Sequence, residues 1–237
     1  MLKAIRFFRF ASLFAVVLLL SACAGSDFKF RDLAKTDTDM VVEAHYQESQ
    51  RLLRELALKL YKRNPREWRK SGVSPEKRVA ELFAQSGPLQ FVELAGVSGT
   101  GAIELALDPG FDGDRVFAFI AGLNHMIRQS YGFHSQFYIF TELNEQQLYY
   151  SARNVEIAAW RLSQGLGDDG RPLLLSNSIS GKLQNLSYER LFGKLIATQD
   201  LLADVMAQKN QRFINKVAQN VATMAFFLCN YSLRLPV

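Results

Sequence analysis

Apolar residues recur at every third or fourth position through most of the chain, and this spacing predicts amphipathic helices. The clearest run predicts a helix over residues 39–63. Asn64-Pro65 would end it, because the residue before a proline avoids the helical region. Thr38 or Asp37 would cap its first turn, since both side chains carry an oxygen that accepts from a backbone N–H group.

Other helices are predicted from their end signals. Ser74-Pro75-Glu76 combines a capping hydroxyl, a proline at the first turn and an acid near the positive end of the helix dipole. Asp114 would cap a third helix that Gly132 ends, and Thr141 would cap a fourth that runs to about Gln164. The chain is therefore expected to be rich in helix.

Two segments have no single prediction. Apolar runs at 89–94 and 102–107 flank a Gly/Ser/Thr-rich stretch, which fits either a hairpin or two short helices. Residues 133–140 are aromatic and short, which fits either a strand or an extended packing segment. The predicted fold class is therefore mainly α, a single helical domain of about five or six helices, with a small β insert allowed at 89–107 or 133–140.

The last element is the longest. Its apolar rhythm starts at Leu191, breaks at Lys209-Asn210-Gln211 and resumes at Val217. The pattern fits one helix of about 40 residues or two helices that meet at the break. We favour two helices, or one kinked helix, because the rhythm fails there. Pairing with another chain as a coiled coil is the weaker alternative to packing within the domain.

The amino end has the features of an export signal. Lys3, Arg6 and Arg9 precede an apolar run over 10–20 that is too short to span a bilayer comfortably, and small residues then lead to Cys23. The stretch Leu20-Ser21-Ala22-Cys23 resembles the lipobox of bacterial lipoproteins. The resemblance implies cleavage before Cys23, a lipidated Cys23 thiol and an acylated Cys23 amine.

This resemblance sets the expected organisation and location. It divides the chain into a signal peptide (1–22), a lipidated tether (23–38) and a helical domain (39–237). The three acyl chains that it implies would hold the protein on a membrane. Ala24 stands where an Asp would favour retention in the inner membrane, so the resemblance implies an outer-membrane lipoprotein that faces the periplasm.

The net charge argues against nucleic acid as a partner. The whole chain has 28 basic and 23 acidic residues, a charge of +5. Three of the basic residues leave with the signal peptide, which leaves 25 against 23, or +2. Such a balance lacks the excess of basic residues typical of nucleic-acid binding. Cys229, without a second cysteine to pair with, is expected to be an inert core residue.

The candidate cofactor and metal motifs in the sequence lack the residues or the spacing that such sites require. Gly96–Gly101 lacks the Lys and Ser/Thr of a phosphate-binding loop, and the third glycine of a dinucleotide fingerprint, so we interpret it as a flexible turn. The three histidines lie outside metal-ligand spacings. Asp108, Asp112 and Asp114 do not form an EF-hand, and Asp114 is explained as a helix cap. We expect no cofactor and no metal.

The first candidate binding surface is basic. Residues 59–78 hold eight cations and two acids, and such a segment can rest on anionic headgroups or on an acidic polymer. The alternative is a solvated basic helix end. The candidate membrane or partner contacts are Arg63, Arg66, Trp68, Arg69 and Lys70.

The second candidate surface is aromatic. Tyr149 and Tyr150 are adjacent on one predicted helix, so they cannot both face inward, and at least one is expected to mark a partner or ligand surface. The core is the expected place for most of the other aromatic residues nearby, which are Tyr131, Phe133, Phe137, Tyr138, Phe140 and Trp160.

These features together favour a binding role over catalysis. We expect an interaction module or accessory subunit of an envelope assembly, held to the membrane by lipid, with an envelope protein or peptidoglycan as its partner. One alternative is a hydrolase or lyase of peptidoglycan, with Glu93, Glu104 or Glu142 as its acid. Another is a carrier of lipid or a small ligand, which requires a sizeable apolar cavity.

Overall fold

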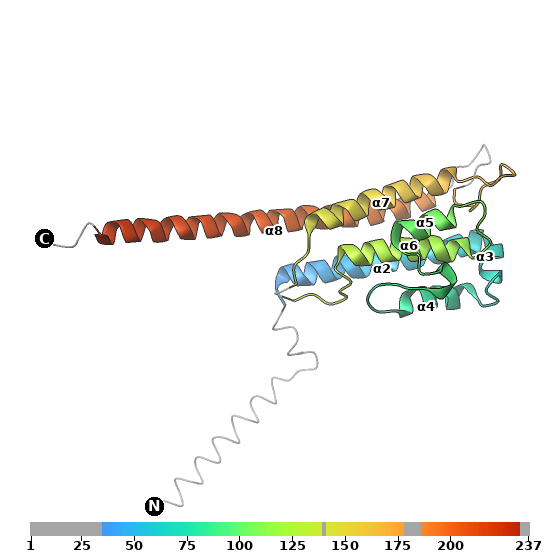
Figure 1. The fold of residues 1–237 in the computed structure, drawn as a ribbon, viewed down its shortest axis with the longest axis horizontal. Coiled ribbons are helices and arrows are strands. Elements are labelled where there is room, and N and C mark those ends of the chain that lie inside the picture. Colours follow the sequence, from blue (N-terminus) through green and yellow to red (C-terminus); the bar gives the residue numbers. More distant parts are fainter. Residues whose placement is uncertain (1–34, 139–140, 178–185, 233–237) are drawn as a thin grey trace, which may run out of the picture.

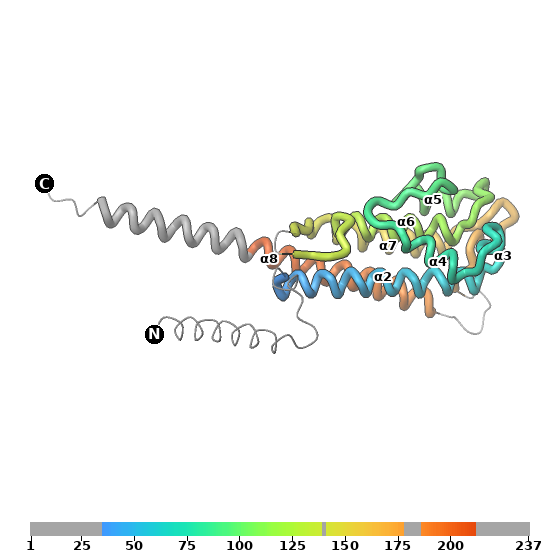
Figure 2. The backbone as a smooth tube through the Cα atoms, turned by 90° about the horizontal axis from the view of Figure 1, so that it is seen from below, coloured from blue at the N-terminus to red at the C-terminus, as the bar shows by residue number. Residues whose placement is uncertain are grey.

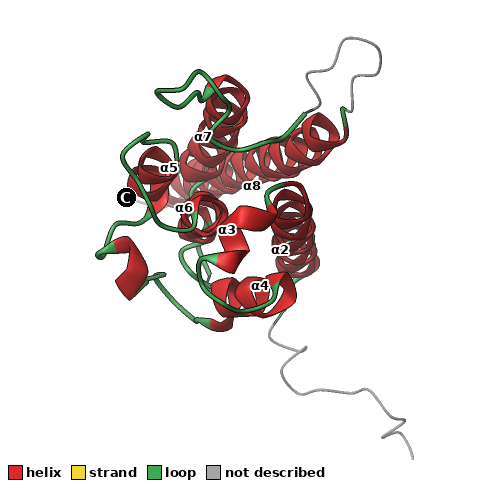
Figure 3. Ribbon diagram, turned by 90° about the vertical axis from the view of Figure 1, so that its right-hand side faces the viewer, coloured by secondary structure: helices red, strands yellow, loops and turns green. Residues whose placement is uncertain are grey.

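The computed structural model describes residues 35–138, 141–177 and 186–232, with side chains as far as residue 211. Four long helices run side by side: α2 (Asp37–Arg63), α6 (Arg115–Ser130), α7 (Glu145–Gln164) and α8 (Ser187–Ser232). Each packs against two of the others in the cyclic order α2, α6, α7, α8 (Figures 1 and 3). The result is a four-helix bundle.

Four short elements gather at the end of the bundle where α2 stops (Figures 1 and 2). They are α3 (Pro65–Arg69), α4 (Pro75–Ala84), the 3-10 helix η2 (Val92–Leu94) and α5 (Gly99–Ala106). The mainly helical prediction is confirmed, and the described residues contain seven α-helices and no strand. Their β pairing is limited to an isolated bridge between Leu166 and Pro172.

The ambiguous segments are settled in favour of helix or loop. Residues 89–113 form η2 and α5, so the two-helix alternative is correct and the hairpin is wrong. Residues 133–138 form no strand, and 139–140 lie outside the described residues. The short α3, which Pro65 starts, was not predicted.

Helix ends follow local capping chemistry, with two corrections. The Thr36 hydroxyl accepts from the Asp39 N–H group while the Asp39 carboxylate accepts from Thr36, a complete capping box, so neither Thr38 nor Asp37 is the cap. Residues 37–38 therefore belong to α2 and not to the tether. The physical reason is that Asp39 at the third helical position gives Thr36 a reciprocal partner.

The second correction concerns α7. Asn144, not Thr141, caps this helix by accepting from the Gln147 N–H group at 3.1 Å. The Thr141 hydroxyl instead accepts from the Tyr138 backbone N–H group. The predicted caps Ser74 and Asp114 are confirmed, since each accepts from the backbone three residues further on.

Helix α8 is continuous over 46 residues, so the favoured break is wrong. Lys209 and Gln211 are exposed, and Asn210 donates to Glu145, the first residue of α7. The apolar pattern of α8 is therefore interrupted where this helix passes the first residue of α7, while its backbone stays helical. None of the described helices has a stretch long and apolar enough to cross a membrane.

Candidate functional site

The basic segment lies at the far end of the bundle from the start of α2. Helix α2 is 27 residues long, so about 40 Å separates its two ends, at 1.5 Å per residue. The segment forms the end of α2, then α3 and the start of α4 (Figure 1). The basic segment is therefore not next to the start of α2, although the two are close in sequence to the amino end.

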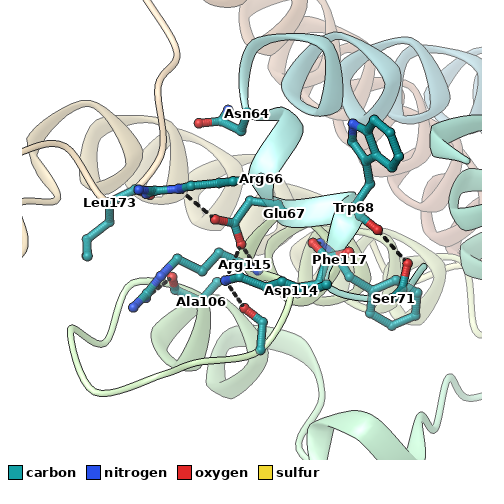
Figure 4. A network of polar contacts seen from close by, with 12 residues as sticks. Asn64, Arg66, Glu67, Trp68, Ser71, Ala106, Asp114, Arg115, Phe117 and Leu173 are labelled. Atoms are coloured by element: carbon teal, nitrogen blue, oxygen red, sulfur yellow. Dashed lines mark hydrogen bonds and ion pairs between the residues drawn. The ribbon is translucent and has the colours of Figure 1, made fainter. Parts of the chain in front are cut away.

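Part of this positive charge forms ion pairs within the protein. The Glu67 carboxylate is buried and accepts from Arg66 Nε at 3.0 Å, from Lys70 Nζ at 2.8 Å and from the Arg115 backbone N–H group at 2.9 Å (Figure 4). Arg66 also donates to the Leu173 carbonyl, and Lys70 to the Gly113 carbonyl. Arg66 and Lys70 thus hold α3 against α6 and the loop after α7.

Arg78 is used in the same way. Its buried guanidinium donates to Glu93 at 2.7 Å and to Asp114 at 3.3 Å, and lies 3.8 Å from the centre of the Phe117 ring. Tyr61 donates to the same Asp114 carboxylate at 3.0 Å. Burial raises the pKa of Asp114, and these hydrogen bonds oppose that rise. The set joins α2, α4 and α6.

The predicted contacts of this segment therefore divide into two groups. Arg63 and Arg69 are exposed, and Arg69 lies 5.3 Å from the centre of the Trp68 ring. Trp68 itself is partly buried against the hydrophobic core. Arg66 and Lys70 bond to Glu67, but their side chains remain 65% and 35% exposed. The structure thus keeps these cations at the surface with part of their charge already paired.

The outer face of α7 shows the opposite behaviour. Tyr149 and Tyr150 are both exposed, at 45% and 52%, where at least one was expected. Ile157 is 53% exposed and Trp160 65% exposed, so Trp160 is an exception among the aromatic residues of which most were expected in the core. Leu148, Val155 and Leu162 supply the buried face of α7, which leaves the remaining apolar side chains outside. The core placement is confirmed for Tyr131 and Phe137, Phe133 and Tyr138 are half-buried, and Phe140 lies outside the described residues.

A groove runs between α5 and this face of α7. A cavity of about 580 Å³ occupies one end, and smaller ones of about 260 and 380 Å³ continue towards the end of α7. Arg161 reaches over the groove to Glu104 of α5, at 3.4 Å. The apolar side chains along it are Tyr150, Ile157 and Trp160, and the wall of the large cavity includes Ser98, Gly99, Thr100, His125, Ser151 and Arg153.

Two glycines fix the position of α5. Gly99 begins the helix at φ +57°, a conformation that side chains rarely adopt. Gly122 of α6 lies under it: a Cβ atom there would come within 2.6 Å of the Gly99 carbonyl oxygen. The stretch 96–101 that we interpreted as a flexible turn holds a turn at Gly96 and then, from Gly99, the first turn of a helix held against α6. Gly122 was the available signal for this packing, since it allows the close backbone approach.

Polar groups at the large cavity lack partners within the described structure. His125 Nδ1, Ser151 Oγ and Arg153 Nε are buried and form no hydrogen bond. Ser98, unlike the caps of α2, α4, α6 and α7, accepts no hydrogen bond from its own helix. Burial lowers the pKa of His125, and the nearby Arg128 charge adds to this while the Leu89 carbonyl opposes it. Sequence reasoning missed this site because its members are more than 20 residues apart.

The three candidate acids do not converge. Glu93 pairs with Arg78, Glu104 pairs with Arg161, and Glu142 is exposed in the loop before α7. The described part of the chain contains no group of three or more His, Cys, Asp or Glu side chains placed to hold a metal ion. The groove offers hydrogen-bond donors and apolar surface, which suits binding. Cys23 lies outside the described residues.

Comparison of the chain with protein families, with characterised proteins and with solved structures finds no match. The geometry of the groove and the sequence pattern of the amino end therefore provide the basis for a functional proposal.

Proposed function

We propose that this chain is a lipid-anchored binding module, or accessory subunit, of a bacterial envelope assembly, and that it holds its partner in the groove between α5 and α7. The lipobox-like stretch that ends at Cys23 supports the anchor and a position on the periplasmic face of the outer membrane. The binding role is non-enzymatic.

One observation carries the binding role. Tyr150, Ile157 and Trp160 are more than half exposed, although each is large and apolar, and they lie beside one continuous groove. Exposed apolar side chains that gather in this way mark interaction sites more often than isolated ones do. Tyrosine, tryptophan and arginine are also the residues that contribute most to binding at protein interfaces.

The tether allows the groove to meet partners near the membrane. Thirteen residue steps separate Cys23 from the cap Thr36, and a fully extended chain covers about 3.3 Å per step. The anchor can therefore lie up to roughly 45 Å from the start of α2. This range fits a module that reaches a membrane-bound or wall-bound partner.

Site-specific photocrosslinking in intact cells tests the binding role. A photoreactive residue at Ile157 is expected to give a discrete adduct, and the same residue at Arg51, exposed on α2, is expected to give none. Trp160→Ala in the Ile157 background should remove the adduct while the protein level stays unchanged. Equal adducts from positions 157 and 51 would contradict the proposal.

The anchor has its own test. Cys23→Ser should prevent acylation, leave the chain unprocessed or soluble, and shift it out of the membrane fraction. Unchanged mass and unchanged fractionation would contradict the anchor and leave the groove unaffected.

A further inference from the structure

The large cavity at the start of α5 differs in character from the rest of the groove. Its wall is formed by the first turn of α5, by His125, Met126 and Gln129 of α6, and by residues of α7. It contains no Asp or Glu side chain. No carboxylate among the lining side chains therefore opposes an anionic ligand.

The backbone supplies the first set of donors. The N–H groups in the first turn of an α-helix have no partner within the helix, and they carry the positive end of its dipole. In α5 the Ser98 side chain does not cap them. Gly99 and Thr100 border the cavity, so the open first turn lies at its wall.

A second, independent observation comes from α7. Ser151 is only 3% exposed, it borders the same cavity, and its hydroxyl has no hydrogen-bond partner. Buried polar groups in native proteins are nearly always hydrogen-bonded, so such a group needs an explanation. His125 Nδ1 and Arg153 Nε, on the same wall, are also buried and unpaired. A bound acceptor would satisfy the open N–H groups of α5 and the Ser151 hydroxyl of α7 at once.

The charges nearby favour a single negative charge. The Arg153 Nη groups already pair with Glu156 at 2.8 Å and with Asp200 at 2.6 Å. Two carboxylates thus face the one guanidinium of Arg153, so no net positive charge is left there, and only the neutral donors of the cavity can attract an anion. A carboxylate fits this better than a doubly charged phosphate, which needs cations close by.

The groove beyond the cavity suits a chain that continues from that carboxylate. From Tyr150 to Gln164 the axis of α7 covers about 21 Å, enough for about six extended residues. Ile157 and Trp160 offer apolar surface along this length. A polypeptide with apolar residues near its end would bury them there.

We propose that the cavity at the start of α5 binds the carboxyl-terminal carboxylate of a polypeptide, whose preceding residues lie along the groove between α5 and α7. The Gly99 and Thr100 N–H groups and the Ser151 hydroxyl donate to the carboxylate. This assignment rests on the proposed binding function and names the chemical group that the site recognises.

Titration of the purified full chain with small probes tests the assignment. The probes are N-acetyl-L-alanine, its amide N-acetyl-L-alaninamide and N-acetyl-D-alanine, followed by amide chemical shifts. N-acetyl-L-alanine should shift the Gly99, Thr100 and Gly101 signals in a saturable way, while the amide should not. Equal shifts with the uncharged amide would overturn the assignment, and tighter binding of the D form would overturn the polypeptide as the source.

Variants separate the site from the fold. Ser151→Ala removes a hydroxyl that has no partner in the protein, so the fold should persist while the Kd for N-acetyl-L-alanine rises at least fivefold. Thr100→Pro removes one N–H group from the first turn, where proline is tolerated, and should weaken binding similarly. Ser163→Ala, on the same helix but outside the cavity, is the control and should leave the Kd unchanged.

An unchanged Kd in Ser151→Ala would overturn the assignment. The crosslink from Ile157 is read independently of these probes. If that crosslink forms but the carboxylate probe does not bind, this inference fails alone. If neither is observed, the proposed binding function fails as well.

Discussion

The basic end of the bundle and the outer face of α7 differ in how far their side chains are already paired within the protein. At the basic end, Arg66, Lys70 and Arg78 form ion pairs with buried Glu67 and Asp114. On the α7 face, Tyr149 and Tyr150 are exposed as the sequence predicted, and Trp160 is exposed as well. A cluster of charged residues in a sequence therefore predicts a binding surface only once the charges that pair within the protein have been excluded.

Removal of Glu67 should have the largest effect on this comparison. Glu67→Ala would leave the buried Arg115 N–H group without an acceptor and would release Arg66 and Lys70, whose side chains are 65% and 35% exposed, so we expect a loss of about 2–3 kcal/mol in the free energy of unfolding. Glu104→Ala, which breaks the exposed pair with Arg161, is the matched control and should cost less than about 1 kcal/mol. Urea unfolding measures both. Equal losses would show that the basic end is not held together from within.

The two tryptophans give the next largest difference. Trp68 packs partly against the core, so Trp68→Ala should lower the free energy of unfolding by roughly 2 kcal/mol. Trp160→Ala should change it by less than about 0.5 kcal/mol, because its side chain is mostly in solvent. Acrylamide should quench the fluorescence of Trp68→Phe, which retains Trp160, more strongly than that of Trp160→Phe. The reverse order would contradict the exposed α7 face.

Neutralising the exposed cations should have a smaller effect. Lys62, Arg63, Arg69 and Lys77 are exposed, and changing all four to Gln should alter stability by no more than about 1 kcal/mol. Each can still contribute about 1 kcal/mol to contact with an anionic membrane. Cosedimentation with vesicles that contain anionic lipid measures this contact. If the quadruple variant binds such vesicles as well as the unmodified chain does, the basic end is not a membrane-binding surface.

The smallest effect concerns the acid side of the stability profile. Burial lowers the pKa of His125 below the ordinary value of about 6.5. Between these two values the unfolded chain binds a proton that the folded chain does not, so stability is retained above about pH 6.5 and falls as the pH decreases towards the folded value. His125→Gln should reduce this slope, whose limit is about 1.4 kcal/mol per pH unit. An unchanged slope in urea unfolding between pH 5 and 7 would contradict it.

Helix ends were predictable where the signal is local. Ser74 and Asp114 cap the expected helices, because a cap bonds to the backbone only three residues away. The α7 cap was displaced by three residues because Thr141 and Asn144 have similar capping chemistry, and the sequence does not rank them. Helix α5 could not be preferred over a hairpin, because the glycines at its start lower its intrinsic helix propensity.

The candidate site could be predicted only in part. Because Tyr149 and Tyr150 are adjacent on a helix, the geometry alone requires that at least one of them is exposed, and in the structure both are. Ser98, His125 and Ser151 could not be brought together from the sequence, because their proximity depends on how α5, α6 and α7 pack. The exposure of Trp160 could not be singled out from the sequence, because an apolar residue on an amphipathic helix is ordinarily expected to face the core.

The sequence by itself determined the helical class, several helix boundaries and the pattern of the amino end, since each depends on residues a few positions apart. Only the tertiary structure decided which charged side chains form ion pairs within the protein and which apolar side chains stay in solvent. Glu67 meets Arg115 across 48 positions, and Arg78 meets Asp114 across 36. Burial and pairing are properties of such distant contacts, and they separate a structural cation from one that is free to bind.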